Sequence, residues 1–134
     1  MGEDYASVAK QFIESYYSTA KANRSGLGSL YRESSVLTFG NDVKVGPAAI
    51  VEYLDEYVYL GEELEHKVHY IDAVPQAGGT VAVLASGALM WPDAPPMLFA
   101  EMFVLMQDGG SYYVGNETLQ LVSLDPSDTY SRDD

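Results

Sequence analysis

Two histidines are the first residues whose chemistry could define a site. His66 and His69 lie three positions apart, and in a regular β-strand that offset places two side chains on opposite faces of the sheet. No third ligand follows from the spacing, so the pattern does not predict a metal site. The chain has no cysteine, which excludes disulfides and thiolate metal sites. The paired glycines at 78–79 and 109–110 are typical of hairpin turns and not of phosphate loops. We therefore expect neither a metal nor a cofactor.

The charge balance limits the class of partner. The 134 residues include 7 Lys and Arg against 20 Asp and Glu, which gives a net charge of −13. Such a protein repels the phosphates of nucleic acid and attracts basic protein surfaces, although the acidity can also serve solubility alone. Lys10 and Glu14 interrupt the apolar residues near the N-terminus, so no signal or membrane-spanning segment is predicted. We expect a protein of the cytoplasm and nucleus with no membrane or nucleic-acid partner.

Two segments have the periodicity of amphipathic helices. Apolar residues recur at intervals of three and four from Asp4 to Ala22, and again from Pro47 to Leu60. Pro47 suits the first turn of a helix, where its missing N–H has no partner to lose. Between these helices, Ser25 can cap a short helix that we expect to end at Ser34-Ser35.

The remaining patterned segments predict strands. Val36–Phe39 and the residues after the turn at 40–42 form a short hairpin, and longer strands follow at about 65–74, 80–91, 97–106 and 112–122. The segment 80–91 is apolar on both faces, whereas helices can cover one face only. We therefore expect the second face to pack on another copy of the chain in a two-fold dimer. The alternative is an uncovered apolar patch.

Four segments, in order along the chain, carry a resemblance to a known family. They are AKQFIESYYSTAKANRSGLGSLYRESSVLTF, GPAAIVEYL, EHKVHYIDAVPQ and AEMFVLMQDGGSYYVGNE, and with their surroundings they cover roughly residues 5–122. The chain is similar to the nuclear transport factor 2 family, small homodimers that carry the GDP form of the GTPase Ran into the nucleus. The resemblance implies an α+β fold: a cone-shaped, curved antiparallel sheet with three helices on its concave side, dimerising sheet to sheet. We expect this domain over residues 1–122 and a disordered acidic tail over 123–134.

The resemblance also implies a binding site at the open end of the cone. There an aromatic side chain of Ran enters the pocket, and acidic residues on the rim pair with basic residues of Ran. Phe39 stands at the position of the family's rim aromatic, and His66 at that of its pocket histidine. Gly40 replaces the rim acid that follows the aromatic, and Asp42 lies two residues further on in the same turn.

A second rim loop departs from the family in the same way. The family's paired acids fall on Pro92 and Ala94, with Asp93 between them. Glu101 stands where the family has glutamine, and three further glutamates precede His66 in a loop about two residues longer than usual. These residues could relocate the salt bridges with Ran, or they could be ordinary solvated surface.

The resemblance implies a second partner, the phenylalanine–glycine repeats of the nuclear pore complex. Tyr5 stands where the family places an exposed aromatic residue at the start of the first helix, and a tyrosine can stack on phenylalanine. A simple contact at the start of the helix is the alternative role. Near the C-terminus, Asn116–Gln120 lacks the family's aromatic and arginine, so we expect a repacked dimer interface.

Two other functions remain open. A related branch of the family forms the small subunit of an mRNA-export heterodimer, lacks the rim acid and does not carry Ran, and Gly40 fits that branch. Some enzymes of the same fold, isomerases and dehydratases, use the cone as an apolar pocket for acid–base chemistry, for which Tyr16, His66 and Glu101 would be the candidates here. Nothing in the sequence shows that these three residues converge, so we predict a non-enzymatic carrier.

Overall fold

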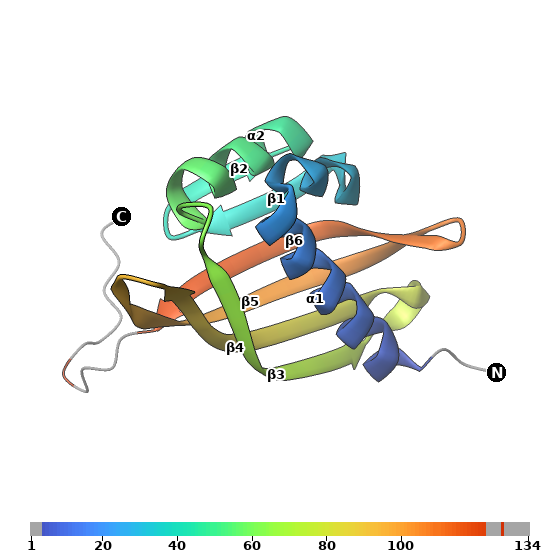
Figure 1. Ribbon diagram of the computed structural model, residues 1–134. Helices are drawn as coiled ribbons and strands as arrows, with labels where there is room; N and C mark the ends of the chain where they lie inside the picture. Colours follow the sequence, from blue (N-terminus) through green and yellow to red (C-terminus); the bar gives the residue numbers. More distant parts are fainter. Residues whose placement is uncertain (1–3, 123–126, 128–134) are drawn as a thin grey trace.

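The computed structural model describes residues 4–122 and 127 and contains one curved sheet with helices on one face (Figure 1). The helical elements are α1 (Tyr5–Ala22), the 3₁₀ helix η1 (Arg24–Leu30), α2 (Pro47–Tyr53), the π-helical turn η2 (Leu54–Val58) and the 3₁₀ turn η3 (Ala77–Gly79). The strands are β1 (Tyr31–Phe39), β2 (Asp42–Val45), β3 (Glu65–Pro75), β4 (Val81–Trp91), β5 (Ala94–Asp108) and β6 (Ser111–Val122). Apart from residue 127, the predicted tail lies outside the described residues.

The sheet has the strand order β2-β1-β6-β5-β4-β3 and does not close. Helix α1 crosses the face of β3–β6, while α2 and η1 lie over the end that carries β1 and β2 (Figure 1). This arrangement confirms the predicted fold, with one refinement. The pairing of β1 with β6 is parallel, and the other four pairings are antiparallel. A parallel pair needs a crossover connection, which the intervening elements supply.

The first two helices begin as the sequence predicts. The Asp4 carboxylate caps α1 by accepting hydrogen bonds from the backbone N–H of Ser7, at 3.4 Å, and from the Ser7 hydroxyl, at 2.8 Å. Pro47 opens α2 directly after Gly46, whose φ of 90° is one that L side chains rarely adopt. None of the helices in the described part of the chain has the length and apolar run that a membrane crossing needs.

The short helix ends earlier than the sequence predicts. η1 stops at Leu30, and the two serines expected to end it lie within β1. Ser35 is buried there, where its hydroxyl donates to the carbonyl of Val114 at 2.5 Å and accepts the N–H of Arg32 at 2.8 Å. These two bonds satisfy backbone groups at the irregular point where β1 pairs with β6. The serines therefore support a bulge and not a helix end.

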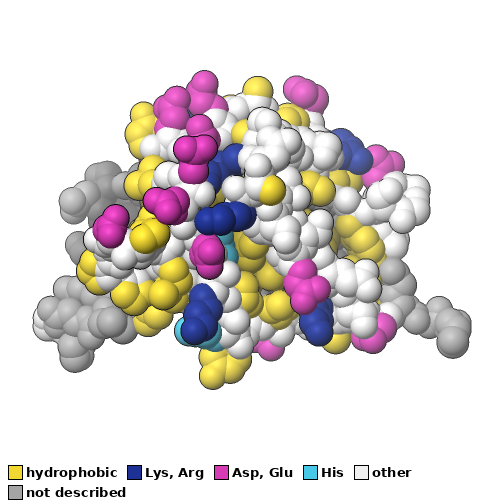
Figure 2. All heavy atoms as spheres, in the orientation of Figure 1, with side chains coloured by type: hydrophobic (Ala, Val, Ile, Leu, Met, Phe, Trp, Pro, Cys, Tyr) yellow, Lys and Arg dark blue, Asp and Glu magenta, His cyan; other side chains and the backbone are white. Residues whose placement is uncertain are grey.

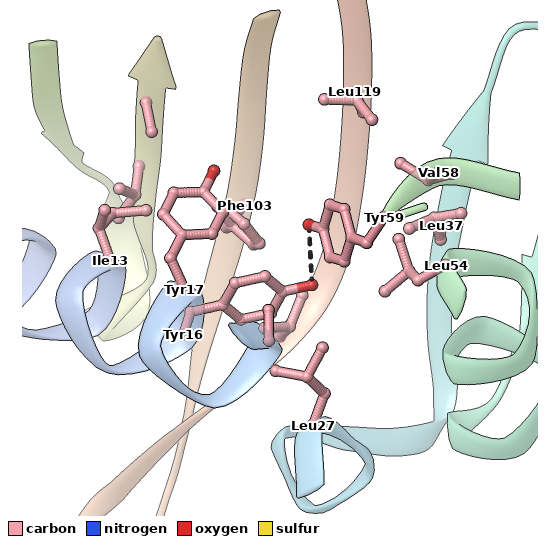
Figure 3. Packing of buried hydrophobic residues seen from close by; sticks show 14 of the residues in the cluster. Ile13, Tyr16, Tyr17, Leu27, Leu37, Leu54, Val58, Tyr59, Phe103 and Leu119 are labelled. Carbon is pink, nitrogen blue, oxygen red and sulfur yellow. Dashed lines mark hydrogen bonds between the residues drawn. The ribbon is translucent and has the colours of Figure 1, made fainter. Parts of the chain in front are cut away.

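The second long helix is also shorter than predicted, because its regular part ends at Tyr53 and the chain continues as the π-helical turn η2. The N–H of Tyr59 bonds to the carbonyl of Leu54 at 2.6 Å, which is the i to i+5 spacing of a π turn. The turn carries the Tyr59 side chain into the core, where it has no exposed surface. Figure 3 shows Tyr59 facing Tyr16 of α1 across the interior.

A bulge in β3 corrects the prediction that His66 and His69 lie on opposite faces. Val68 pairs with Gly87 and Tyr70 with Ser86, so His69 is an extra residue. The alternation shifts there, and both histidines line one groove beside α1. Gly87 makes the bulge possible, because a Cβ at that position would lie 1.9 Å from the carbonyl oxygen of Lys67.

The core lies between the sheet and the helices and is rich in tyrosine and phenylalanine (Figure 3). Tyr16 packs edge to face on Phe103 of β5, with ring centres 4.8 Å apart. On the opposite face of the sheet, large apolar side chains remain exposed. Leu84 of β4 and Met102 of β5, which are 41% and 39% exposed, are direct cross-strand neighbours on that face. The sheet is therefore apolar on both faces within one chain, as predicted.

Candidate functional site

A groove at one end of the cone is formed by two loops and has a volume of about 560 Å³. One loop connects η2 to β3, and the other connects β4 to β5. We call this groove the mouth, and the residues that line it are Leu60, Gly61, Glu62, Glu63, Trp91, Pro92, Asp93 and Ala94. Figure 2 shows acidic side chains gathered over α2 and the loop that follows it.

The mouth carries three carboxylates and no basic side chain. Glu62, Glu63 and Asp93 are exposed, and none of them forms an ion pair with another residue of the described part of the chain. Their charges add to the strongly negative field of a chain with net charge −13. The groove is therefore suited to a positively charged partner, with the Trp91 ring and Pro92 as its apolar surface.

Side chains from other elements hold the loop between η2 and β3 in place. The guanidinium of Arg24, in η1, donates to the carbonyl of Tyr59 and, at 2.9 Å, to that of Gly61. The indole N–H of Trp91, at the end of β4, donates to the carbonyl of Leu60 at 2.8 Å. Three consecutive carbonyls of the loop are thus bound.

Phe39 and Asp42 contact α2, and neither of them is among the residues that line the mouth. Phe39 is half-buried with its ring edge-on to Tyr53, at 6.3 Å between ring centres. The Asp42 carboxylate accepts a hydrogen bond of 2.7 Å from the hydroxyl of Tyr53. Of the five residues predicted for the pocket and rim, Asp93 alone lines this groove.

His66 lies inside the cone and not on its rim. Its ring stacks on Tyr17 at 3.9 Å and 11° and meets the rings of Tyr59 and Phe99 edge-on. Its Nε2 is buried without a hydrogen-bond partner. Burial, together with the positive charge of Arg24, lowers the pKa of His66 to about 3, so the imidazole is neutral at physiological pH.

The groove that contains both histidines lies between α1 and β3 and has a volume of about 670 Å³. Lys21 and Glu65 form an ion pair of 3.8 Å within it, between largely exposed side chains. Two histidines are too few for a closed metal site. Within residues 4–122 and 127, no three potential metal ligands of the His, Asp and Glu types come together.

Glu101 was predicted at the rim or on the solvated surface, and the structure places it in the core instead. Its side chain has no exposed surface. The two carboxylate oxygens accept hydrogen bonds of 2.7 Å from Tyr17 and 2.7 Å from Tyr59. Residue 101 is on the inward-facing set of β5 positions with Phe99 and Phe103, so the strand alternation buries it. Glu101 cannot pair with a partner's basic residue from this position.

A second buried acid, Glu117, is not among the site residues that the sequence predicts. It accepts hydrogen bonds from Tyr31 at 2.5 Å and from Tyr16 at 3.1 Å. Burial raises the pKa of Glu117 well above its usual range, and the nearby negative charge of Glu101 raises it further. The signal available in the sequence was the alternation of β6, which places residue 117 on the same buried face as Leu119.

The three residues named for acid–base chemistry do meet in this buried cluster. Tyr59 links Glu101 to Tyr16, through a hydroxyl contact of 3.3 Å that Figure 3 draws, and its ring also touches His66. Tyr16 and Glu101 are, however, both 0% exposed. Tyr16 and Glu101 therefore form part of a polar core, and of the three residues only His66 lines the groove beside α1.

Tyr5, the residue predicted to bind nucleoporin repeats, is the first residue of α1. Its side chain is partly buried and packs against the hydrophobic core. This contact agrees with the alternative role at the helix start. It also leaves part of the ring accessible, so both roles remain compatible with the position.

The family model and the relatives in sequence agree on one family. The family model described as the nuclear transport factor 2 domain matches residues 8–121. A nuclear transport factor 2 of Emericella nidulans is 39% identical over 122 residues, which cover 89% of this chain and 96% of that protein. Its counterpart in Oryza sativa is 38% identical over 120 residues, covering 88% and 97%. The solved structure of nuclear transport factor 2 from Cryptosporidium parvum has a TM-score of 0.80 at 27% identity, covering 91% of this chain and 98% of that one.

Proposed function

The chain belongs to the nuclear transport factor 2 family, and from this premise we propose that it is a non-enzymatic carrier that binds Ran in its GDP form. It would work between the cytoplasm and the nucleus and pass through the nuclear pore complex. The names of its relatives support the transport role, and their aligned lengths match this chain almost end to end. The burial of Tyr16 and Glu101 supports a role without catalysis.

The observation that carries the proposal is the acidic mouth. Family members pair rim carboxylates with basic residues of Ran, and this chain has lost the acids at the family positions. Glu62, Glu63 and Asp93 supply three unpaired carboxylates around the same end of the cone. Charge-assisted contacts at a partly desolvated rim contribute more than exposed pairs do, so relocated carboxylates can sustain binding.

We propose that the carrier is a homodimer joined through the outer face of its sheet. Leu84 and Met102 lie side by side on that face, and further exposed apolar side chains extend it along the other strands. An apolar face of this extent on a lone chain would favour aggregation, whereas a two-fold pair of sheets covers it in both copies.

Binding to phenylalanine–glycine repeats is proposed at Tyr5. The substitution Tyr5→Ala should weaken binding to repeat peptides and leave Ran binding intact, because the start of α1 lies outside the mouth. Equal binding of repeats by the variant and the wild type would assign Tyr5 to the helix contact alone.

Titration of the purified protein against Ran in its GDP and GTP forms tests the carrier function. We expect preferential binding of the GDP form, with an affinity that falls as salt is added. Asp93→Lys should abolish binding without lowering thermal stability, since Asp93 has no described partner within the chain. Asp42→Lys tests the rim acid that the sequence predicts and that lies outside the mouth, and we expect it to weaken binding and to lose the bond from Tyr53. A wild type with no preference for the GDP form would favour the export-heterodimer role.

A further inference from the structure

Trp91 is the chain's single tryptophan, and its position suggests a role in shaping the mouth. Its ring lines the groove, while its indole N–H donates to the carbonyl of Leu60 on the facing loop at 2.8 Å. It is the last residue of β4, so the hydrogen bond ties the end of the sheet to the loop that follows η2. The two loops that form the groove are thereby joined.

Arg24, in η1, holds the same loop by two further carbonyls. Besides its bonds to Tyr59 and Gly61, the guanidinium is fixed by the carbonyl of Ala20 at 3.2 Å and by the carboxylate of Asp55 at 3.0 Å. Its side chain is only 14% exposed, and its bonds to the carbonyls of Ala20 and Tyr59 are partly buried, whereas those to Asp55 and Gly61 lie at the surface. Arg24 therefore provides a rigid support, and Trp91 closes the loop against it.

The carboxylates that follow depend on this support. Glu62 and Glu63 are exposed, and no described hydrogen bond or ion pair holds either side chain. Gly61, just before them, has a φ of 83°, which turns the chain toward the groove. The place of both carboxylates is thus set by the backbone of residues 59–61, which Arg24 and Trp91 bind.

We propose that Trp91 is the positioning residue of the mouth: through its bond to Leu60 it holds Glu62 and Glu63 beside Asp93, ready to receive a cationic side chain of the partner. Fixing the loop before binding reduces the ordering that association must supply. The identity of the partner rests on the proposed carrier function. The positioning of the loop by Trp91 does not depend on which partner binds.

Cleavage by a protease specific for glutamate tests the hold on the loop. Trp91→Phe keeps an aromatic ring and removes the N–H donor. We expect the full chain carrying it to be cut after Glu62 or Glu63 about three- to tenfold faster than the wild type, the range that follows from losing one neutral hydrogen bond. Cleavage after Glu52, within α2, should not change, which separates local opening from global unfolding.

Two further variants serve as a control for the cleavage experiment and as a test of the second support of the loop. Tyr57→Phe alters an aromatic residue that is 63% exposed and outside the mouth, and it should be cut at the wild-type rate. Arg24→Lys removes the planar group that bonds two carbonyls at once and should open the same loop. An unchanged cleavage rate after Glu62 and Glu63 in Trp91→Phe would overturn the proposal.

Titration with Ran in its GDP form tests the consequence for binding. We expect Trp91→Phe to bind about three- to tenfold more weakly than the wild type and Tyr57→Phe to bind equally well. Faster cleavage with unchanged affinity would refute the role of the loop in partner binding. If the wild type itself fails to bind Ran, the carrier function fails, and the cleavage rates alone decide whether Trp91 positions the loop.

Discussion

The buried carboxyl group of Glu117 predicts an unusual dependence of stability on pH. The folded protein raises the pKa of Glu117 above the ordinary glutamate value of 4.5, so the folded state retains a proton that the unfolded chain releases. The stabilising effect is fully present below pH 4.5 and is lost as pH rises through the folded-state pKa. The free energy of unfolding should therefore fall by up to about 1.4 kcal/mol per pH unit in that interval because of this one group.

The substitution Glu117→Gln isolates the effect. The glutamine keeps the shape of the side chain but cannot titrate, so the pH-dependent component disappears. Tyr31 and Tyr16 each donate to a different oxygen of Glu117, and one of them loses its acceptor when an amide NH₂ replaces that oxygen. At pH 5 the lost hydrogen bond should lower the free energy of unfolding of the variant by about 1 kcal/mol relative to the wild type. This difference should become smaller as pH rises, because only the wild type is destabilised by the titration.

Urea denaturation of both proteins from pH 5 to 9, at one protein concentration, measures the difference. Both proteins contain His66, so its titration cancels when the two curves are subtracted. Glu52→Gln, which alters an exposed glutamate on α2, is the matched control and should parallel the wild type. Parallel curves for Glu117→Gln and the wild type would refute the elevated pKa.

Three other substitutions test the core, the bulge and the dimer. His66 has a folded pKa of about 3 against an ordinary 6.5, so stability should fall as pH drops through this window, and His66→Phe should abolish that loss in denaturation curves from pH 4 to 7. Gly87→Ala should destabilise by about 1–3 kcal/mol, because its Cβ would strike a backbone oxygen, whereas Gly110→Ala meets no atom within 4 Å and should be neutral in thermal melts. Leu84→Lys would bury an unpaired charge between two sheets and should yield monomers in sedimentation, and a wild type that sediments as a monomer would contradict the dimer.

The sequence predicted the main elements because their signals are local. Apolar spacing marked α1 and α2, Gly46 and Pro47 marked the start of the second helix, and glycine turns separated the long strands. The boundaries at Leu30 and Tyr53 were wrong for a nonlocal reason. Ser35 bonds across the sheet to Val114, and the π turn after Tyr53 carries Tyr59 to a core made by other elements.

For the candidate site, too, local signals gave correct predictions and nonlocal contacts did not. Matching residues along the chain identified Asp93 as a rim acid, and the structure places it in the mouth. The same matching made Glu101 a candidate for the rim, because it stands where the family has glutamine, and solvated surface was the alternative. Its burial depends on hydroxyl groups of Tyr17 and Tyr59, which no sequence spacing brings within 2.7 Å.

The sequence alone determined the family, the fold class and the acidic character of the surface. Each of these properties depends on many residues together, so a wrong element boundary does not change the conclusion. The tertiary structure decided which carboxylates meet solvent and which meet tyrosines. That outcome depends on the π turn before Tyr59 and on the inward faces of β5 and β6, each of which is set by packing between distant segments. Burial raises the pKa of Glu117 in the core, whereas Glu62 and Glu63, of the same residue type, lie exposed at the mouth.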